Sequence, residues 1–284
     1  FRLTMMLFAV ISIALFWVTF ATTRERVKPL QEKSDLKRDF QAMLDNLPWL
    51  TLFFAAIFTL MNVAVRNGAI MYYFKYYVGD DGTPIFLIFD KTAVFMSLGL
   101  FAMIAGIACT KALASRFDKR LLLIVLSILN ALLMAAFYFI PPDQYWLMVA
   151  VNMLSTLVIG PTPALVWAMY ADTADYGEWK SGRRTTGLVF SALQFAQKLG
   201  LAVGAGLSGF ILSLFGFIAN EVQSEQSING IRLMFSIFPA ALAMAGVVAV
   251  LFYPLRDKKV REIEAELNQR HGYGNDDETV KAAS

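Results

Sequence analysis

The sequence has a single cysteine, and its charged residues are not spread evenly along the chain. Each of these two features excludes a class of structure or partner. Its single cysteine, Cys109, lies within an apolar run, so no disulfide can form within the chain. Charged residues make up 17% of the 284 residues and fall in short clusters, so we expect no broad basic surface and no nucleic-acid partner. The chain starts at Phe1, directly in an apolar run without a small-residue cleavage site, so no signal peptide is predicted. We expect a piece of a longer protein.

Long apolar runs are what the chain has in abundance. Hydrophobic residues make up 57% of the sequence and gather in runs of about 20, the length that a helix needs to cross a hydrocarbon layer of ~30 Å. The pattern predicts an all-α polytopic membrane protein. Its seven transmembrane helices are expected at residues 3–21, 48–78, 92–112, 120–140, 144–170, 187–215 and 231–254.

Connections that are rich in lysine and arginine alternate along the chain with connections that have almost none. They occur in the linker at 22–47, in the third and fifth connections and in the tail, whereas the second, fourth and sixth connections contain only Lys91. Connections rich in lysine and arginine stay on the cytoplasmic side of a membrane. The alternation predicts that the charged loop at 171–186 and the C-terminal tail are cytoplasmic.

Two segments outside the spans show local patterns. The linker at 22–47 is long and charged and is expected to act as a hinge, with a surface helix near 35–45. The tail at 257–270 predicts a solvated helix with one apolar stripe, formed by Val260, Ile263 and Leu267. The last dozen residues are expected to be disordered.

The sixth span carries the strongest functional signal. Ser191, Gln194 and Lys198 are spaced to share one face of a helix. Lys198 falls near the middle of the membrane, where a charged side chain is costly unless it faces water or a carboxylate. Gly200 and Gly204 form a pair of small residues that allows close packing against another helix.

Two other spans contain polar residues. In the second span, Asn62 and Arg66 share a face. Arg66 either lines a polar cavity, or it snorkels or pairs structurally. In the fifth span, Gly160-Pro161-Thr162-Pro163 predicts a kink, and kinked helices at mid-depth are where transporters place their substrate sites. Trp167, one turn further on, suits either the apolar face of a sugar ring or an interfacial anchor.

The stretch from Ala171 to Lys180, ADTADYGEWK, precedes Arg184 and a glycine-rich helix with Lys198. It resembles the glycoside–pentoside–hexuronide:cation symporters, a branch of the major facilitator superfamily. The resemblance covers nearly the whole chain, from that family's sixth helix to its tail. Four residues of the second span are similar to the family's seventh helix: Arg66, Tyr72, Tyr73 and Tyr77. The stretch Arg116–Arg120 is similar to the basic turn after its eighth helix.

The resemblance implies a twelve-helix sugar:cation symporter of the bacterial inner membrane that works by alternating access, not an enzyme. In this family the co-transported cation is Na⁺ or H⁺, and no cofactor is expected. The chain would supply the last helix of the N-terminal bundle and the whole C-terminal bundle. The implied boundaries are 1–21 for that last helix, 22–47 for the cytoplasmic linker, 48–255 for the six-helix bundle and 256–284 for the cytoplasmic tail.

The resemblance also implies roles for individual residues. Lys198 matches the lysine that links the sugar and cation sites, and Gln194 replaces a small polar residue. The family's acidic sugar and cation ligands lie in helices 1, 2 and 4, so no complete metal site is expected in this chain. Four residues in the cytoplasmic loops match family positions that form ionic contacts with the other bundle and so act as a gate. They are Arg116, Asp172, Asp175 and Arg184.

Two other functions compete with this interpretation. A proton-coupled drug or metabolite carrier of the same superfamily would share the fold. A membrane-embedded transferase would use Asp172-Thr173-Ala174-Asp175 to hold Mg²⁺ on a diphosphate, but it needs a second acidic cluster on the same side. The only candidate, Gly79-Asp80-Asp81-Gly82, is predicted to lie outside. Neither the sugar nor the coupling ion can be named from the sequence.

Overall fold

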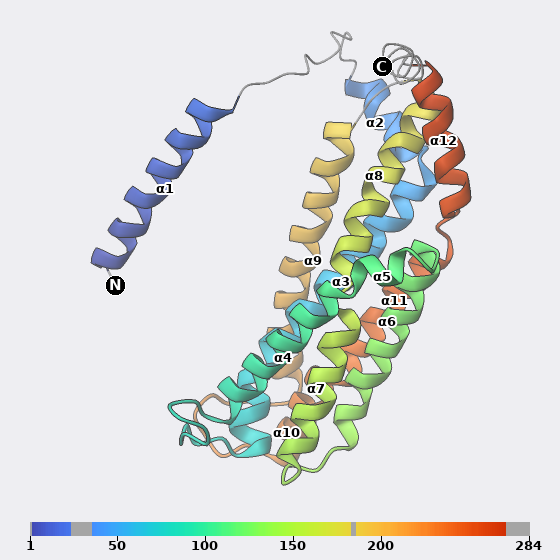
Figure 1. The fold of residues 1–284 in the computed structure, drawn as a ribbon. Coiled ribbons are helices and arrows are strands. Elements are labelled where there is room, and N and C mark those ends of the chain that lie inside the picture. Colours follow the sequence, from blue (N-terminus) through green and yellow to red (C-terminus); the bar gives the residue numbers. More distant parts are fainter. Residues whose placement is uncertain (1, 24–35, 183–185, 271–284) are drawn as a thin grey trace. The chain divides into compact units, whose positions relative to one another are not determined.

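The computed structural model describes residues 2–23, 36–182 and 186–270, and these residues form helices and turns without a named strand (Figure 1). The chain divides into two units, Phe1–Leu36 and Lys37–Ser284. The first unit contains α1 (Arg2–Thr22), whose described side chains are all exposed. The other helices of the described residues lie in the second unit, apart from Leu36, the first residue of α2.

Seven stretches of the described residues are long and apolar enough to cross a membrane. The first is α1, and the other six belong to the second unit. This confirms the predicted helical membrane architecture. The elements of the six later spans are α3 (Leu47–Tyr72) with a π-helical turn (Tyr73–Val78), α4 (Lys91–Ala108), α6 (Lys119–Ala136) with a 3-10 turn (Phe137–Phe139), α7 (Tyr145–Ile159) with α8 (Thr162–Ser181), α9 (Thr186–Leu214), and α10 (Glu225–Phe235) with α11 (Ile237–Leu251).

Side-chain caps mark where several of these helices begin. The carboxylate of Asp90 accepts the Ala93 amide at 2.7 Å at the start of α4, and Asp118 accepts the Leu121 amide at 3.2 Å at the start of α6. Such caps satisfy amides that have no partner within the helix. The acidic residues between the apolar runs therefore set the starting points of two spans.

Two of the predicted spans consist of two helices each. The fifth breaks at Gly160–Pro161, because Pro161 and Pro163 have no amide hydrogen for the carbonyls one turn earlier. The kink predicted there is therefore present as a break between α7 and α8. The last span breaks at Ser236, whose backbone angles of −122° and −74° are not helical.

Helix α3 packs against both α9 and α11, and α4 packs against α7. Glycines allow the closest of these contacts. A Cβ atom on Gly200 would lie 2.5 Å from the carbonyl oxygen of Ile57, and one on Gly204 would lie 2.7 Å from that of Met61. The close packing predicted for this glycine pair is confirmed, with α3 as the partner.

The charged segment at 171–186 was expected to be a loop, and this is wrong for most of its length. Helix α8 continues to Ser181 and ends at Gly182, whose φ of 69° lies in the left-handed region that terminates many helices. Ala171 to Ser181 contains no proline, so its charge alone does not interrupt the helix. Residues 183–185 lie outside the described residues.

Both helices predicted outside the spans are present. The linker contains α2 (Leu36–Leu44), and the tail contains α12 (Asp257–Arg270). Val260, Ile263 and Leu267 are buried, as the apolar stripe predicts. A short α5 (Thr110–Ala114) follows α4. The predicted disorder of the last dozen residues concerns residues outside the described part, and the predicted domain boundaries remain predictions.

Because α9 touches α3 through backbone, we expect Gly200→Ala to lower the thermal stability of the detergent-solubilised protein by about 1–3 kcal/mol, the usual effect of overpacking. Gly206→Ala is the matched control on the same helix, since no atom lies within 4 Å of its added Cβ. The control should be neutral or slightly stabilising. Equal melting temperatures for the two variants would contradict the close contact.

Candidate functional site

Helix α9 presents the three polar residues predicted for it on one exposed face. Ser191, Gln194 and Lys198 are all exposed, whereas Leu193 and Ala196 are buried. Among the described residues, Lys198 forms no hydrogen bond or ion pair. The structure therefore brings the three predicted residues together and leaves the ammonium of Lys198 open for interactions beyond the described part of the chain.

Arg66 on α3 lies in a different environment. Its Nη1 donates to the carbonyl oxygen of Phe235 at 3.3 Å, and its Nη2 donates to Oδ1 of Asn152 on α7 at 3.5 Å. The guanidinium also lies over the rings of Phe137 and Phe235, at 4.9 and 4.4 Å from their centroids. No carboxylate within the described residues pairs with it. Carbonyl, amide and ring faces together hold this cation inside the bundle.

The contact with Phe235 has a structural consequence. Phe235 is the last residue of α10, next to the break at Ser236, where carbonyl groups lose their partners one turn ahead. Arg66 supplies a donor to one of them from another helix. Of the two interpretations left open by the sequence, the geometry favours structural pairing. Asn62, one turn earlier on α3, is also buried.

A second arginine was not singled out from the sequence. Arg232 on α10 donates from Nη2 to the Tyr138 carbonyl oxygen at 2.5 Å and lies over the rings of Tyr77 and Tyr138, while its buried Nε has no partner among the described residues. The signal was available, because position 232 falls inside the predicted last span.

Trp167 lies where α8 meets α9. Its ring stacks on Phe190 of α9, with centroids 6.0 Å apart and planes 12° apart, and it contacts the edge of Tyr170 at 5.6 Å. The side chain is 44% exposed. One part of the indole is therefore used for packing between helices, and the remainder is open.

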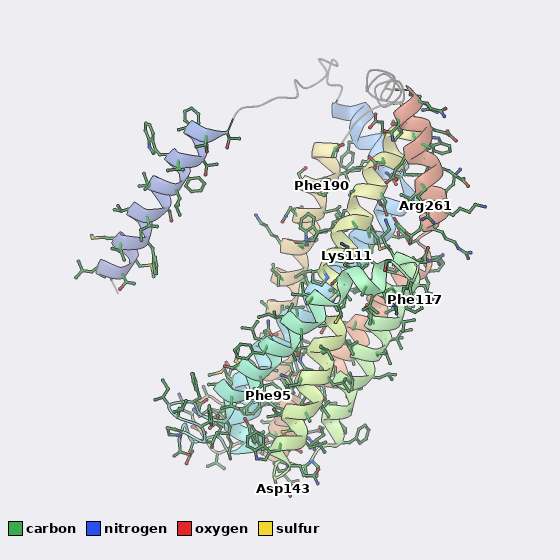
Figure 2. All side chains as sticks on the ribbon, viewed as in Figure 1. Phe95, Lys111, Phe117, Asp143, Phe190 and Arg261 are labelled. Carbon is green, nitrogen blue, oxygen red and sulfur yellow. The ribbon has the colours of Figure 1, made fainter. Side chains whose placement is uncertain are left out.

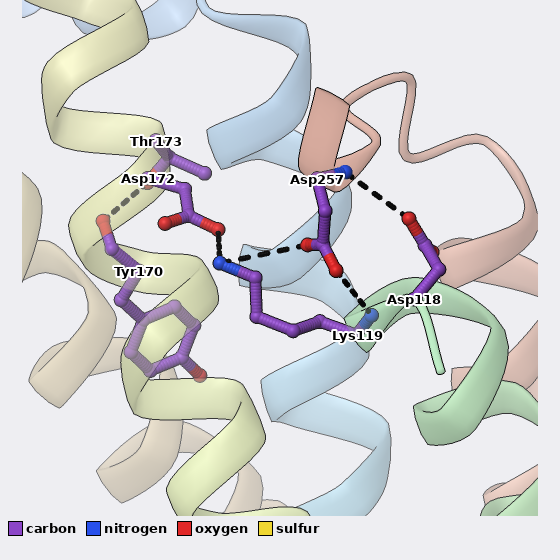
Figure 3. Close-up of polar contacts among 6 residues, drawn as sticks. All are labelled: Asp118, Lys119, Tyr170, Asp172, Thr173 and Asp257. Carbon is purple, nitrogen blue, oxygen red and sulfur yellow. Dashed lines mark hydrogen bonds and ion pairs between the residues drawn. The ribbon is translucent and has the colours of Figure 1, made fainter. Parts of the chain in front are cut away.

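The end of the second unit that carries α12, here called the α12 end, holds a network of charges (Figure 3). Nζ of Lys119 lies 2.5 Å from Oδ2 of Asp172 on α8 and 3.7 Å from Oδ1 of Asp257 on α12. The backbone amide of Lys119 donates to Asp257 at 3.3 Å, and the amide of Asp257 donates to Asp118 at 3.1 Å. One lysine at the start of α6 thus joins α8 and α12.

Tyr253 lies beside this network. It is 1% exposed, and its hydroxyl has no hydrogen-bond partner among the described residues. Burial raises the pKa of Tyr253, and the carboxylates of Asp172, Asp257 and Asp118 raise it further because they repel a phenolate. The hydroxyl therefore stays protonated at physiological pH.

Helix α8 also anchors the neighbouring segments. The side-chain amide of Asn46 donates to the Thr173 carbonyl oxygen at 2.8 Å, just after α2. At the far end of α8, Nε1 of Trp179 donates to Glu266 at 2.6 Å, and Arg270 donates to the Trp179 carbonyl oxygen at 3.2 Å. The segment after α2 and helix α12, which lie before and after the six spans in the sequence, are therefore both hydrogen-bonded to the charged part of α8.

The predicted gate residues fall in three situations. Asp172 is buried and paired with Lys119 within its own unit, a partner that the sequence did not predict. Asp175 is half-buried on α8, and Arg116 is exposed in the turn before α6. Arg184 lies outside the described residues. Ionic contacts between these residues and another bundle remain a prediction.

No three His, Cys, Asp or Glu side chains come together as metal ligands within residues 2–23, 36–182 and 186–270. Three polar features described above bear on function: the open face of α9, the internal arginines and the network at the α12 end.

Comparison with known proteins gives this arrangement a context. Residues 1–257 match the family described as MFS/sugar transport protein. The chain is 28% identical to a glucuronide carrier protein homolog of Escherichia coli, over 92% of this chain and 56% of the relative. It is 31% identical to the isoprimeverose transporter of Lactiplantibacillus pentosus (95% and 55%) and 31% identical to a putative glycoside/cation symporter of E. coli (90% and 54%). The chain spans about half the length of these relatives.

The pairing of Lys119 with Asp172 predicts strong coupling between the two positions. Asp172→Leu should lower the free energy of unfolding by about 3 kcal/mol, because it leaves a largely buried ammonium short of its nearest partner. The double variant with Lys119→Met should recover much of this loss in denaturant unfolding. Lys259→Met is the matched control, since its pair with Glu262 is exposed and is worth at most about 1 kcal/mol. Additive effects of Lys119→Met and Asp172→Leu would contradict the pairing.

Arg66 and Asn152 should also be coupled, because the amide helps to hold the guanidinium at the helix break. A double-mutant cycle of Arg66→Gln and Asn152→Leu, followed by thermal unfolding, should give a coupling energy of about 1–2 kcal/mol. Asn67 is exposed and lies next to Arg66, so Asn67→Ala is the control. It should show no coupling energy with Asn152→Leu. Independent effects of the first pair would show that the amide does not support the arginine.

Proposed function

Because the chain belongs to the MFS/sugar transport protein family, we propose that it forms part of a secondary transporter that carries a glycoside, pentoside or hexuronide together with a cation by alternating access. The names of its relatives include a glucuronide carrier homolog, an isoprimeverose transporter and a glycoside/cation symporter, which supports this substrate class. Membership of a transport family leaves the transferase interpretation without support.

The open ammonium of Lys198 is the observation that carries the proposal. Lys198 lies 12 residues after the first residue of α9, about 18 Å along the helix axis, and therefore near mid-membrane. A cation at that depth costs at least ~2.5 kcal/mol unless water or an opposite charge reaches it. A face with an ammonium, an amide and a hydroxyl offers donors and acceptors to both a sugar and a cation site.

The gate is proposed at the α12 end, which the charge alternation places in the cytoplasm. The pair of Lys119 and Asp172 holds α8 in place. Asp175, half-buried on the same helix, and Arg116, exposed in the turn before α6, are the other described residues that we assign to the gate. Partly exposed ion pairs contribute about 0–1 kcal/mol each, enough to bias two alternating states without locking either. The cation ligands are proposed to lie in helices of the complete transporter that this chain does not contain.

The test is uptake of a labelled glycoside panel into vesicles that contain the complete transporter, with and without a Na⁺ or H⁺ gradient. Lys198→Ala should abolish cation-coupled accumulation, because the fixed charge that links the two sites is lost. Lys258→Ala, a lysine on α12 outside the spans, is the control and should accumulate substrate normally. Full accumulation by Lys198→Ala would remove the proposed role. Proton-dependent efflux that responds to neither sugars nor Na⁺ would instead favour a drug or metabolite carrier.

Charge reversal at Asp175 tests the gate separately. Asp175→Lys should weaken the state that is closed on the cytoplasmic side and so increase the labelling of cytoplasmic cysteine probes. Glu262→Lys on the exposed side of α12 is a matched reversal that should change neither labelling nor transport. Unchanged transport and accessibility in Asp175→Lys would exclude Asp175 from the gate.

A further inference from the structure

A cavity of about 630 Å³ lies at the end of the second unit opposite α12. Figure 2 shows Asp143 at this end and Arg261 of α12 at the other. The cavity is formed where the π-helical turn after α3, the start of α4 and the start of α7 meet. Its walls include four aromatic rings and two charged side chains, Tyr76, Tyr77, Tyr145, Trp146, Lys91 and Asp143. Lys198 is not among its lining residues.

Hydrogen bonds to the main chain hold the three tyrosines in place. The Tyr145 hydroxyl donates to the carbonyl oxygen of Lys91 at 2.9 Å, and the Tyr77 hydroxyl donates to that of Ile140 at 2.8 Å. The Tyr76 hydroxyl accepts the amide of Asn220 at 3.0 Å. Each ring is therefore tied to a different segment of the chain. The three tyrosine rings are therefore preformed walls, and the Tyr76 hydroxyl, which accepts, can still donate to a ligand.

The remaining polar groups of the cavity are not used within the described residues. Neither the ammonium of Lys91, the carboxylate of Asp143 nor the indole N–H of Trp146 forms a hydrogen bond or ion pair there. Trp146 is 67% exposed, and its ring lies 5.1 Å from that of Tyr145. An aromatic wall, held in place at its three tyrosines, thus stands beside an ammonium and a carboxylate that keep their hydrogen-bonding capacity.

We propose that this cavity is a second glycoside-binding site, distinct from the face of α9, which captures the substrate at the outer surface before transport. The apolar face of a pyranose ring stacks on an aromatic ring, while its hydroxyls need both donors and acceptors at the edge. The cavity has the size of small-molecule sites, which are mostly apolar with a few polar groups. The outer location and the substrate class rest on the proposed function.

Such a site has a kinetic consequence. It holds bound substrate close to the entrance and so increases the rate of capture, without taking part in the conformational change. Loss of the site should therefore raise the KM for uptake and leave kcat unchanged, whereas loss of Lys198 should remove accumulation at any substrate concentration. The two sites can thus be distinguished in the same protein.

The experiment places a single reporter cysteine at Ile85, a wall residue of the cavity, in the complete transporter with Cys109→Ser and all other cysteines replaced. Lys198→Ala is included so that turnover does not interfere. 4-Nitrophenyl β-D-xyloside and 4-nitrophenyl β-D-glucuronide are the probes, and labelling by a membrane-impermeant maleimide is measured. At least one of the two glycosides should slow the labelling in a saturable manner.

Trp146→Ala should raise the half-protecting concentration about two- to tenfold, the usual worth of one aromatic contact. Asp143→Asn should also raise it, and Trp146→Phe should retain most of the protection. Phe139→Ala is the matched control, because Phe139 is 77% exposed in the turn before Pro141 and does not line the cavity. Uptake by the same variants with Lys198 intact provides the KM and kcat.

The outcomes separate the two proposals. Saturable protection that depends on Trp146 supports the site, whether or not that glycoside is transported. Failure of the whole glycoside panel to accumulate, with this protection intact, would refute the proposed function alone. Transport of a glycoside that gives no protection at Ile85→Cys overturns the inference and leaves the proposed function intact. Protection that is equal in Trp146→Ala and Phe139→Ala also overturns it. Labelling that is slowed by lipid composition and not by glycoside would assign the aromatic wall to the membrane interface.

Discussion

The ammonium of Lys119, held between the carboxylates of Asp172 and Asp257, is the contact on which the α12 end of the structure depends. Asp172 is only 8% exposed, so its charge is tolerable only with a partner close by. The partner comes from α6, and the second carboxylate comes from the first residue of α12. One cation therefore fixes the spacing of three segments, and the charged part of α8 then serves as the support for the segments on both sides of the six spans.

Arg66 and Lys198, two of the cations within the spans, are accommodated in opposite ways. Arg66 is held inside the bundle by a carbonyl, an amide and two aromatic faces, so its charge is compensated without a carboxylate from the described residues. Lys198 has none of these contacts and is exposed. A guanidinium offers several donors in a fixed plane and suits the first task, whereas an ammonium on a flexible stem suits the second. The first cation holds helices together, and the second is available to a solute.

The sequence predicts those features that depend on the membrane or on local pattern. Span lengths follow from the thickness of the hydrocarbon layer, and the stripe of Val260, Ile263 and Leu267 follows from helical periodicity, so both were predictable. The choice of Lys119 as the partner of Asp172 depends on how α6 and α8 pack, which no spacing reveals. The helical state of Ala171 to Ser181 was missed because charge density was interpreted as a loop. Of the candidate site, the face of α9 was predictable, and the cage around Arg66 was not.

The docking of α12 has a practical consequence for handling the protein. Its three apolar side chains join the same cluster as Trp49, Tyr170 and Tyr253, so this amphipathic segment is part of the folded core. Shortening the chain ahead of Asp257 would uncover that cluster to water and take away one of the two acidic neighbours of Lys119. Affinity tags and fluorescent fusions therefore belong beyond Arg270, where they leave the helix and its anchoring contacts intact.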